Sequence, residues 1–98
     1  MAQASARIGP NAVTRLAEAL EALRGAGGAG PVFGRAGLAH RLASPPERMV
    51  EEQEVIALHA ALRAMLPAAE AEAVAADAGR RTADYLLAHR IPRLMRVL

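Results

Sequence analysis

The chain has 98 residues, 53% of them hydrophobic and 22% charged, a composition typical of one globular domain rather than a disordered segment. It contains no cysteine, which excludes disulfides, thiolate metal sites and cysteine nucleophiles. The formal net charge is only +2 and all twelve basic residues are arginine, so the charge balance alone does not indicate a nucleic-acid partner.

The first predicted helix begins at Pro10-Asn11, because proline is well tolerated at the first helical position, where its missing N–H has no partner to lose. It ends at Gly25, a residue type that commonly follows the last helical turn. The apolar residues recur at helical spacing and predict one buried face. That face consists of Val13, Leu16, Leu20 and Leu23.

Residues 25–31 form a glycine-rich connector to a second predicted helix over residues 32–42, with Phe33, Leu38 and Leu42 as its apolar positions. The connector contains the spacing G-x-G-x-x-G. A dinucleotide site needs a strand before this string and a helix N-terminus after it, whereas here a helix precedes the string and Pro31 follows. A nucleotide site is therefore not favoured.

The third predicted helix starts at three acidic residues, Glu51, Glu52 and Glu54, which the positive end of the helix dipole favours, and it ends at Pro67. Its apolar residues again recur at helical spacing. They are Val55, Leu58, Leu62 and Leu66, with His59 among them.

The fourth predicted helix covers residues 68–90. Gly79 and Ala83 lie four residues apart on it and predict a seam where a neighbouring backbone approaches closely. Ile91-Pro92 interrupts this helix, and residues 93–98 begin a further amphipathic stretch without a stop signal. The predicted packing face of the fourth helix is Ala71, Val74, Ala75, Ala78, Thr82, Tyr85 and His89.

These elements predict an all-α fold, a small bundle of four to five helices forming a single domain over residues 1–98, with no strand. The unfinished last stretch predicts that the chain is the N-terminal portion of a longer protein. No run approaches the ~18 apolar residues of a membrane span, and the first residues have no apolar core of signal-peptide length, so we expect a cytoplasmic protein.

The three histidines, His40, His59 and His89, have no pair at the four-residue spacing of helical zinc ligands, and we predict no protein-bound metal and no catalytic constellation. Each histidine also has an ordinary structural interpretation. The arginines near the C-terminus can meet phosphates or carboxylates, or form a solvated face. Nucleic-acid binding would call for aromatic stacking residues or a helix-turn-helix signature, and both are missing.

Several segments, in order along nearly the whole chain, resemble the bacteriochlorophyll 4-vinyl reductase family. The most specific part is residues 82–87 (TADYLL) followed by residues 89–92 (HRIP). The other segments are residues 7–12, 36–38, 49–52 and 78–81 and the pairs Leu58-His59 and Leu62-Arg63.

The resemblance implies a photosynthetic bacterium and a role in the tetrapyrrole pathway to bacteriochlorophyll. It also implies continuation into a larger α/β domain that binds small apolar molecules. The expected partners are a tetrapyrrole intermediate or pigment-biosynthesis enzymes, with a peripheral position at the photosynthetic membrane as an alternative to a free cytoplasmic one. Reducing a vinyl group needs a hydride or electron donor, and nothing in these residues binds one. We therefore predict an accessory protein that handles or delivers a Mg-tetrapyrrole of the chlorophyllide type, and whether it is an enzyme stays open.

The predicted ligand site is an apolar groove between the third and fourth helices. His59 is the first choice as a nitrogen ligand to magnesium, because it interrupts an aliphatic face where leucine would be more usual. His89 is the second choice, with Tyr85 on the same face and with Arg90 and Arg93 close enough in sequence to meet a carboxylate. No intrinsic cofactor is predicted.

The alternative is a helical interaction module without a ligand. The apolar faces and the Gly79–Ala83 seam would then contact a partner helix or a second copy of the chain in a homodimer.

Overall fold

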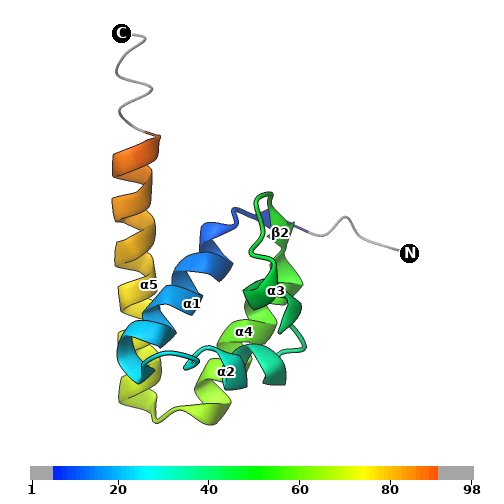
Figure 1. The fold of residues 1–98 in the computed structure, drawn as a ribbon, viewed down its shortest axis with the longest axis vertical. Helices are drawn as coiled ribbons and strands as arrows, with labels where there is room; N and C mark the ends of the chain where they lie inside the picture. The colour runs from blue at the N-terminus through cyan, green and yellow to red at the C-terminus, as the bar shows by residue number, and fades with distance from the viewer. Residues whose placement is uncertain (1–5, 91–98) are drawn as a thin grey trace, which may run out of the picture.

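The computed structural model describes residues 6–90, and within this range it contains five helices and one small antiparallel sheet (Figure 1). The predicted all-α bundle of four to five helices is confirmed. The elements in chain order are β1 (Arg7–Ile8), α1 (Asn11–Arg24), α2 (Gly30–Arg35), α3 (His40–Ala43), β2 (Val50–Glu51), α4 (Glu52–Met65) and α5 (Ala68–His89).

The boundaries of α1, α4 and α5 lie where the sequence predicts them. Pro10 precedes α1, and Gly25 follows it with a φ of 88° while its N–H donates to the Glu21 carbonyl at 2.7 Å. Pro67 separates α4 from α5. Glycine favours this left-handed backbone and proline cannot continue a helix, so the local chemistry of these residues sets the boundaries.

The helix predicted over residues 32–42 is wrong, because the structure has two short helices, α2 and α3, separated at Gly37. Gly37 has a φ of 74°. Its N–H donates to the carbonyl of Gly34, and the N–H of Leu38 donates to the carbonyl of Phe33 at 2.8 Å. These two bonds satisfy the last carbonyls of α2 and are those of a Schellman motif, which terminates a helix.

The prediction of no strand is also wrong. Arg7 pairs with Glu51 and Ile8 with Val50, so β1 and β2 form an antiparallel pair. The Arg7 and Glu51 side chains add an ion pair of 3.7 Å. The sheet attaches the segment before α1 to the start of α4, two parts of the chain that lie far apart in sequence.

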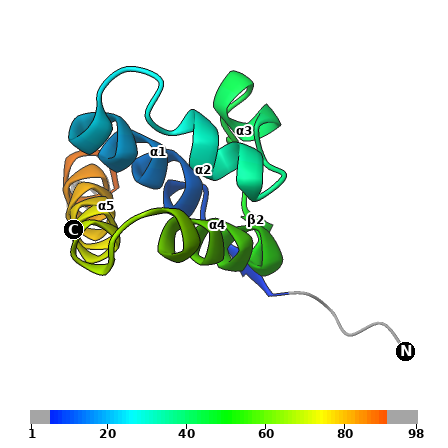
Figure 2. The same cartoon turned by 90° about the horizontal axis from the view of Figure 1, so that it is seen from below.

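The core lies between α1, α2, α4 and the first half of α5. Figures 1 and 2 show α5 running antiparallel beside α1 and α4 lying against α2. Phe33, Leu16, Leu20 and Leu58 are fully buried, and every buried side chain of the described residues is hydrophobic. Leu23 departs from the prediction, because it is 45% exposed at the end of α1. The remaining core residues are Val13, Ala19, Ala29, Val32, Leu38, Val50, Ala61, Leu62, Leu66, Ala71 and Val74.

Burial along α5 stops well before its end. At 1.5 Å per residue the 14 residues of α1 span about 21 Å and the 22 residues of α5 about 33 Å, so α1 cannot cover all of α5. Figure 1 shows the C-terminal part of α5 extending past α1. Ala71 and Val74 are buried, whereas Tyr85 and His89 are exposed. The predicted packing face is therefore right for the first half of α5 and wrong for the second.

The predicted close-packing seam is wrong within this chain. Gly79 and Ala83 are both exposed, and a Cβ built at Gly79 would have no heavy atom within 4 Å. No helix among residues 6–90 is long and apolar enough to cross a membrane.

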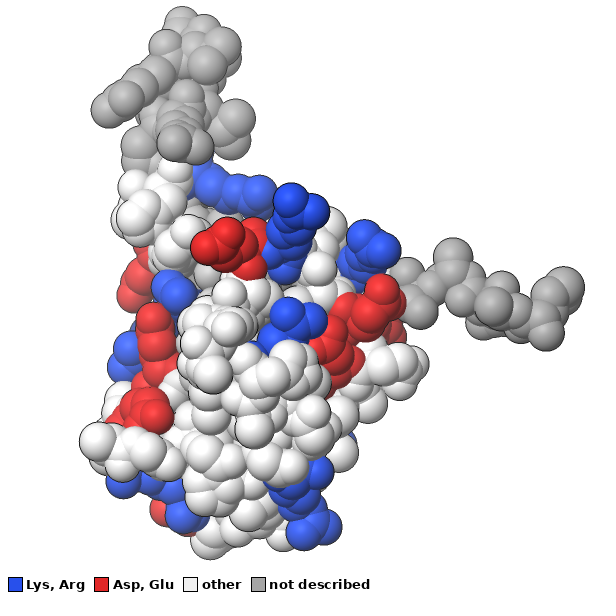
Figure 3. Space-filling view, turned by 45° about the vertical axis from the view of Figure 1, so that its right-hand side comes forward, with Lys and Arg blue, Asp and Glu red and all other residues white. Residues whose placement is uncertain are grey.

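Acidic and basic side chains lie next to one another on the face drawn in Figure 3. Ion pairs account for this arrangement, because six arginines of the described residues contact carboxylates. They are Arg7, Arg15, Arg24, Arg41, Arg80 and Arg81.

Candidate functional site

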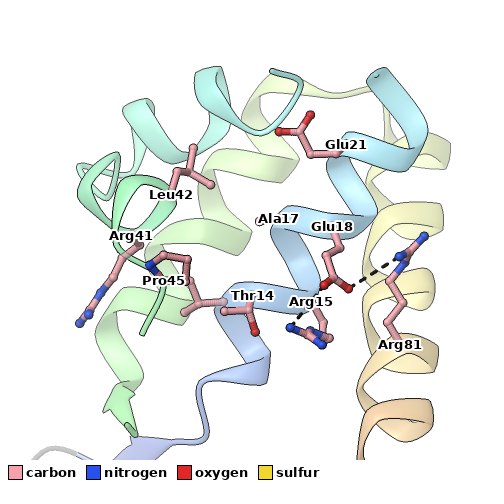
Figure 4. Close-up of a pocket in the computed structure, with 10 residues that line it drawn as sticks. Thr14, Arg15, Ala17, Glu18, Glu21, Arg41, Leu42, Pro45 and Arg81 are labelled. Carbon is pink, nitrogen blue, oxygen red and sulfur yellow. Dashed lines mark ion pairs between the residues drawn. The ribbon is translucent and has the colours of Figure 1, made fainter. Parts of the chain in front are cut away.

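Two surface cavities with mixed polar and apolar walls are candidate binding sites. The larger, of about 430 Å³, lies between α1, α3 and the segment after α3 (Figure 4). Its walls combine aliphatic side chains with a rim of arginine and glutamate. The lining residues are Val13, Thr14, Arg15, Ala17, Glu18, Glu21, Arg41, Leu42, Pro45 and Arg81.

The charged side chains of this larger cavity form ion pairs or hydrogen bonds with protein groups, but the buried Nε of Arg15 has no hydrogen-bond partner among the described residues. Arg41 donates two hydrogen bonds to the Glu54 carboxylate, at 2.8 and 2.9 Å. These bonds raise the pKa of Arg41 and lower the pKa of Glu54. Glu18 lies 3.3 Å from Arg15 and 3.7 Å from Arg81. An incoming anion would have to displace these carboxylates. Two of the ion pairs, Arg41–Glu54 and Arg81–Glu18, link different helices, which is an ordinary structural role for these charges.

The smaller cavity, of about 310 Å³, is a groove between α4 and α5, which we call the His59 groove. The sequence predicted an apolar groove between these two helices. Leu62, Ala68, Ala71 and Ala75 supply its apolar walls. Its polar side chains are His59 and Arg63 from α4 and Glu72 from α5.

His59 is half-buried, and its imidazole forms no hydrogen bond within residues 6–90. Burial lowers the pKa of His59, and the positive charge of Arg63 lowers it further. A lowered pKa keeps the ring neutral at pH 7, and the neutral ring has the nitrogen lone pair that a metal ion needs. The groove is partly open to solvent, so a flat molecule bound there would be only partly covered by protein.

The structure brings Tyr85 and His89 together but places them away from His59. Their ring centroids are 4.4 Å apart, and the guanidinium of Arg15 lies 4.8 Å above the Tyr85 ring. His89 is fourteen residues beyond Ala75, the last lining residue of the His59 groove, or about 21 Å along the helix. The first and second choices of magnesium ligand therefore belong to two separate places on the molecule.

Arg90 is exposed and directly follows α5, whereas Arg93 lies outside the described residues. His40 is exposed on the short helix α3 and lies in neither cavity. Among residues 6–90 there is no group of three or more histidine or acidic side chains that could hold a metal ion.

The glycine-rich connector does not present free amides to a phosphate. The N–H of Gly28 donates to the carboxylate of Glu21 at 2.9 Å, and α2 after it has only six residues. The protein itself therefore supplies the anion for this amide.

Sequence reasoning did not assign a role to Arg63 or Glu72. Arg63 follows His59 by four residues on one helix, and side chains at this spacing share a face. That spacing could have identified Arg63. Glu72 could not have been identified in this way, because its position depends on how α5 packs against α4.

Comparison with known proteins gives one informative similarity. The chain is 42% identical over 96 residues to a protein named bacteriochlorophyll synthase 23 kDa chain, from Cereibacter sphaeroides. The match covers 94% of this chain and 45% of that protein, so the chain spans about half the length of its relative. No family model matches the chain, and no solved structure matches it. Membership of the 4-vinyl reductase family is therefore not confirmed and stays a prediction.

Proposed function

We propose that this chain takes part in bacteriochlorophyll biosynthesis, as an accessory protein that binds a Mg-tetrapyrrole intermediate in the His59 groove and delivers it to another protein. The similarity to the bacteriochlorophyll synthase 23 kDa chain, which extends over nearly the whole of this chain, supports the pathway. Because the relative is about twice as long, its full activity is not transferred to this chain.

The burial, the lowered pKa and the hydrogen bonding of the His59 imidazole support binding in the groove. Its ring is half-buried between aliphatic residues, its pKa is lowered and it has no hydrogen-bond partner among residues 6–90. The ring nitrogens of His59 are not among the buried side-chain atoms that lack a partner, so they are accessible to a ligand. One of them would form an axial bond to magnesium, while the macrocycle covers Leu62, Ala71 and Ala75.

The size and shape of the groove favour delivery over catalysis within this chain. Small-molecule sites commonly have volumes of about 300–1,000 Å³ and enclose most of their ligand. At about 310 Å³ and partly open to solvent, the His59 groove would cover one part of a macrocycle and leave the rest accessible. A partner enzyme could then take up the exposed part before the protein releases the ligand.

The test is a titration of the purified chain with chlorophyllide a, followed by absorbance in the Soret region and by fluorescence. We expect binding in the micromolar range and a Soret shift in the wild type, and no shift in His59→Leu. His40→Leu is the matched control, because His40 is exposed and outside both cavities, and it should keep the wild-type response. Circular dichroism checks that both variants keep their helix content. Wild-type protein without any spectral change, or His59→Leu with the full shift, would contradict the proposal.

A homodimer or a helical interaction module is the second candidate, and the uncovered end of α5 favours it. Tyr85 is 37% and Leu87 57% exposed there, and the space above Gly79 is open. Sedimentation equilibrium at high micromolar concentration tests this candidate: a monomer would eliminate self-association.

A further inference from the structure

The second half of α5 lacks the buried contacts that hold the first half. Ala78 is the last residue of α5 that packs against the hydrophobic core, and none of residues 80–89, which we call the arm, is buried. The arm is about 15 Å long and extends past α1 (Figure 1). Segments with few buried apolar contacts open locally at a lower free energy than the core. Burial therefore stabilises the first half of α5 but not the arm.

The arm joins the rest of α5 at Gly79. Glycine is the least favourable helix residue apart from proline, and a Cβ at Gly79 would meet no heavy atom within 4 Å, so packing within this chain does not require glycine there. An isolated helix shorter than about 12 residues is marginal in water, and the arm is shorter than that. The arm is therefore helical only because it continues the covered half of α5 and because its side chains contact neighbouring groups.

Arg81 holds the arm in two directions. Its Nε donates a hydrogen bond to the Asp77 carboxylate at 2.8 Å, across Gly79, and its Nη1 lies 3.7 Å from Glu18 on α1. Ion pairs between partly exposed side chains contribute little each, so a few such contacts can break without loss of the core. Further side-chain contacts of the arm are Arg80 with Asp77, Thr82 with the Ala78 carbonyl and Tyr85 with Arg15.

We propose that the arm is an opening element of the larger cavity, which unfolds locally from Gly79 onward while the remainder of the fold stays intact. Arg81 and Glu18 both line that cavity (Figure 4), so opening removes Arg81 from its wall and leaves Glu18 paired with Arg15 alone. The His59 groove keeps its walls, because its lining residues on α5 end at Ala75. The inference therefore goes beyond the proposed function and does not depend on it.

Amide hydrogen exchange, followed residue by residue by nuclear magnetic resonance, tests whether the arm opens as a unit. The amides of residues 84–89 should exchange at similar rates, at least about tenfold faster than those of residues 72–78. Their exchange should also depend little on low urea concentrations, because local opening exposes little surface. Equal protection and equal urea dependence in both halves of α5 would overturn the inference. A gradual loss of protection toward His89 would overturn it as well, since that is ordinary fraying of a helix end.

Two substitutions change the arm in opposite directions. Gly79→Ala should slow the exchange of residues 84–89 about fivefold, the factor given by the difference in helix propensity. Arg81→Gln should accelerate it about two- to fivefold, because the contacts with Asp77 and Glu18 are lost. Arg35→Gln is the matched control, because Arg35 is an exposed arginine on α2, and it should leave the arm unchanged. Arm exchange that is the same in Arg81→Gln and in the wild type would refute the assigned role of Arg81.

The link between the arm and the larger cavity has its own readout. Methyl groups of Val13 and Leu42 line the cavity and should show relaxation dispersion at the rate at which the arm opens, whereas methyl groups of the fully buried Leu58 should show none. An arm that opens without dispersion at Val13 and Leu42 would refute the link. None of these outcomes affects the proposed function, which the chlorophyllide titration tests separately.

Discussion

Gly79→Ala should stabilise the protein, although the sequence alone suggested that Gly79 is needed for close packing. Gly79 lies in the interior of α5, is exposed, and has an open space of at least 4 Å where a Cβ would be placed. The added methyl group therefore meets no steric conflict within the chain. The substitution therefore acts through helix propensity. Glycine in a helix interior is less favourable than alanine by about 1 kcal/mol, partly because glycine has more conformational freedom in the unfolded chain.

The expected size of the effect follows from the length of the chain. For domains of 60–100 residues, 1 kcal/mol corresponds to a change in melting temperature of roughly 4–8 °C. Thermal unfolding followed by circular dichroism at 222 nm would measure the shift, and urea unfolding would give the change in free energy independently.

Gly37→Ala provides the control, since it is the same substitution with the opposite expected sign. Gly37 has a φ of 74°, and placing an L-residue in that left-handed region costs roughly 1–2 kcal/mol. A lower melting temperature for Gly79→Ala would refute the reasoning. It would mean that another chain, such as a second copy, packs on Gly79 in solution and cannot accommodate the methyl group.

Three further predictions concern the core and two titrating groups. Phe33→Ala should destabilise by about 3–5 kcal/mol in urea unfolding, because Phe33 is completely buried among the residues of α1, α2 and α4, and a smaller loss would show that the core can collapse around the gap. Arg41→Gln should destabilise the protein more at pH 7 than at pH 3. The Arg41 hydrogen bonds lower the pKa of Glu54 in the folded chain, so the stability that this pair contributes is fully present above the ordinary pKa of about 4.5 and is lost as the pH falls through the lowered pKa. Burial lowers the pKa of His59 in the folded chain, so on acidification the unfolded chain binds a proton there first, and wild-type stability should fall as the pH drops below about 6.5. His59→Leu should lose less stability than the wild type between pH 7 and pH 5. An equal loss in both proteins would contradict the assigned burial of His59.

The sequence predicts α1, α4 and α5 well because their signals are local. Pro10, Gly25 and Pro67 determine the helix boundaries through backbone chemistry, and the apolar spacing between them determines which side is buried. The sequence shows a glycine at position 37 but does not show that this glycine ends a helix. Its effect depends on the two capping hydrogen bonds, which sequence spacing does not reveal.

Features that depend on distant contacts could not be predicted. The pairing of β1 with β2 joins two-residue strands more than forty positions apart, and segments this short have no periodic pattern. The end of α5 has the same apolar spacing as its beginning, yet Tyr85 and His89 are exposed because this end of α5 extends past α1, from which the Arg15 side chain reaches the Tyr85 ring.

The candidate site also combines features that follow from local sequence with features that depend on how the helices pack. The sequence predicted a groove between α4 and α5 and placed His59 in it, because both follow from the apolar faces of two helices joined by Pro67. The separation of His59 from His89 by most of the length of α5 follows only from the way the helices pack.

The most direct test of the central claim is a nuclear magnetic resonance titration of isotopically labelled protein with chlorophyllide a. The ring current of a macrocycle bound at His59 shifts nearby protons strongly, and the shift falls steeply as their distance from the ring increases. We predict that the largest shifts fall on the imidazole of His59 and on the methyl groups of Ala71 and Ala75, while Tyr85 and His89 keep their positions. Shifts concentrated on Tyr85 and His89, with His59 unaffected, would contradict the assignment of the His59 groove as the binding site.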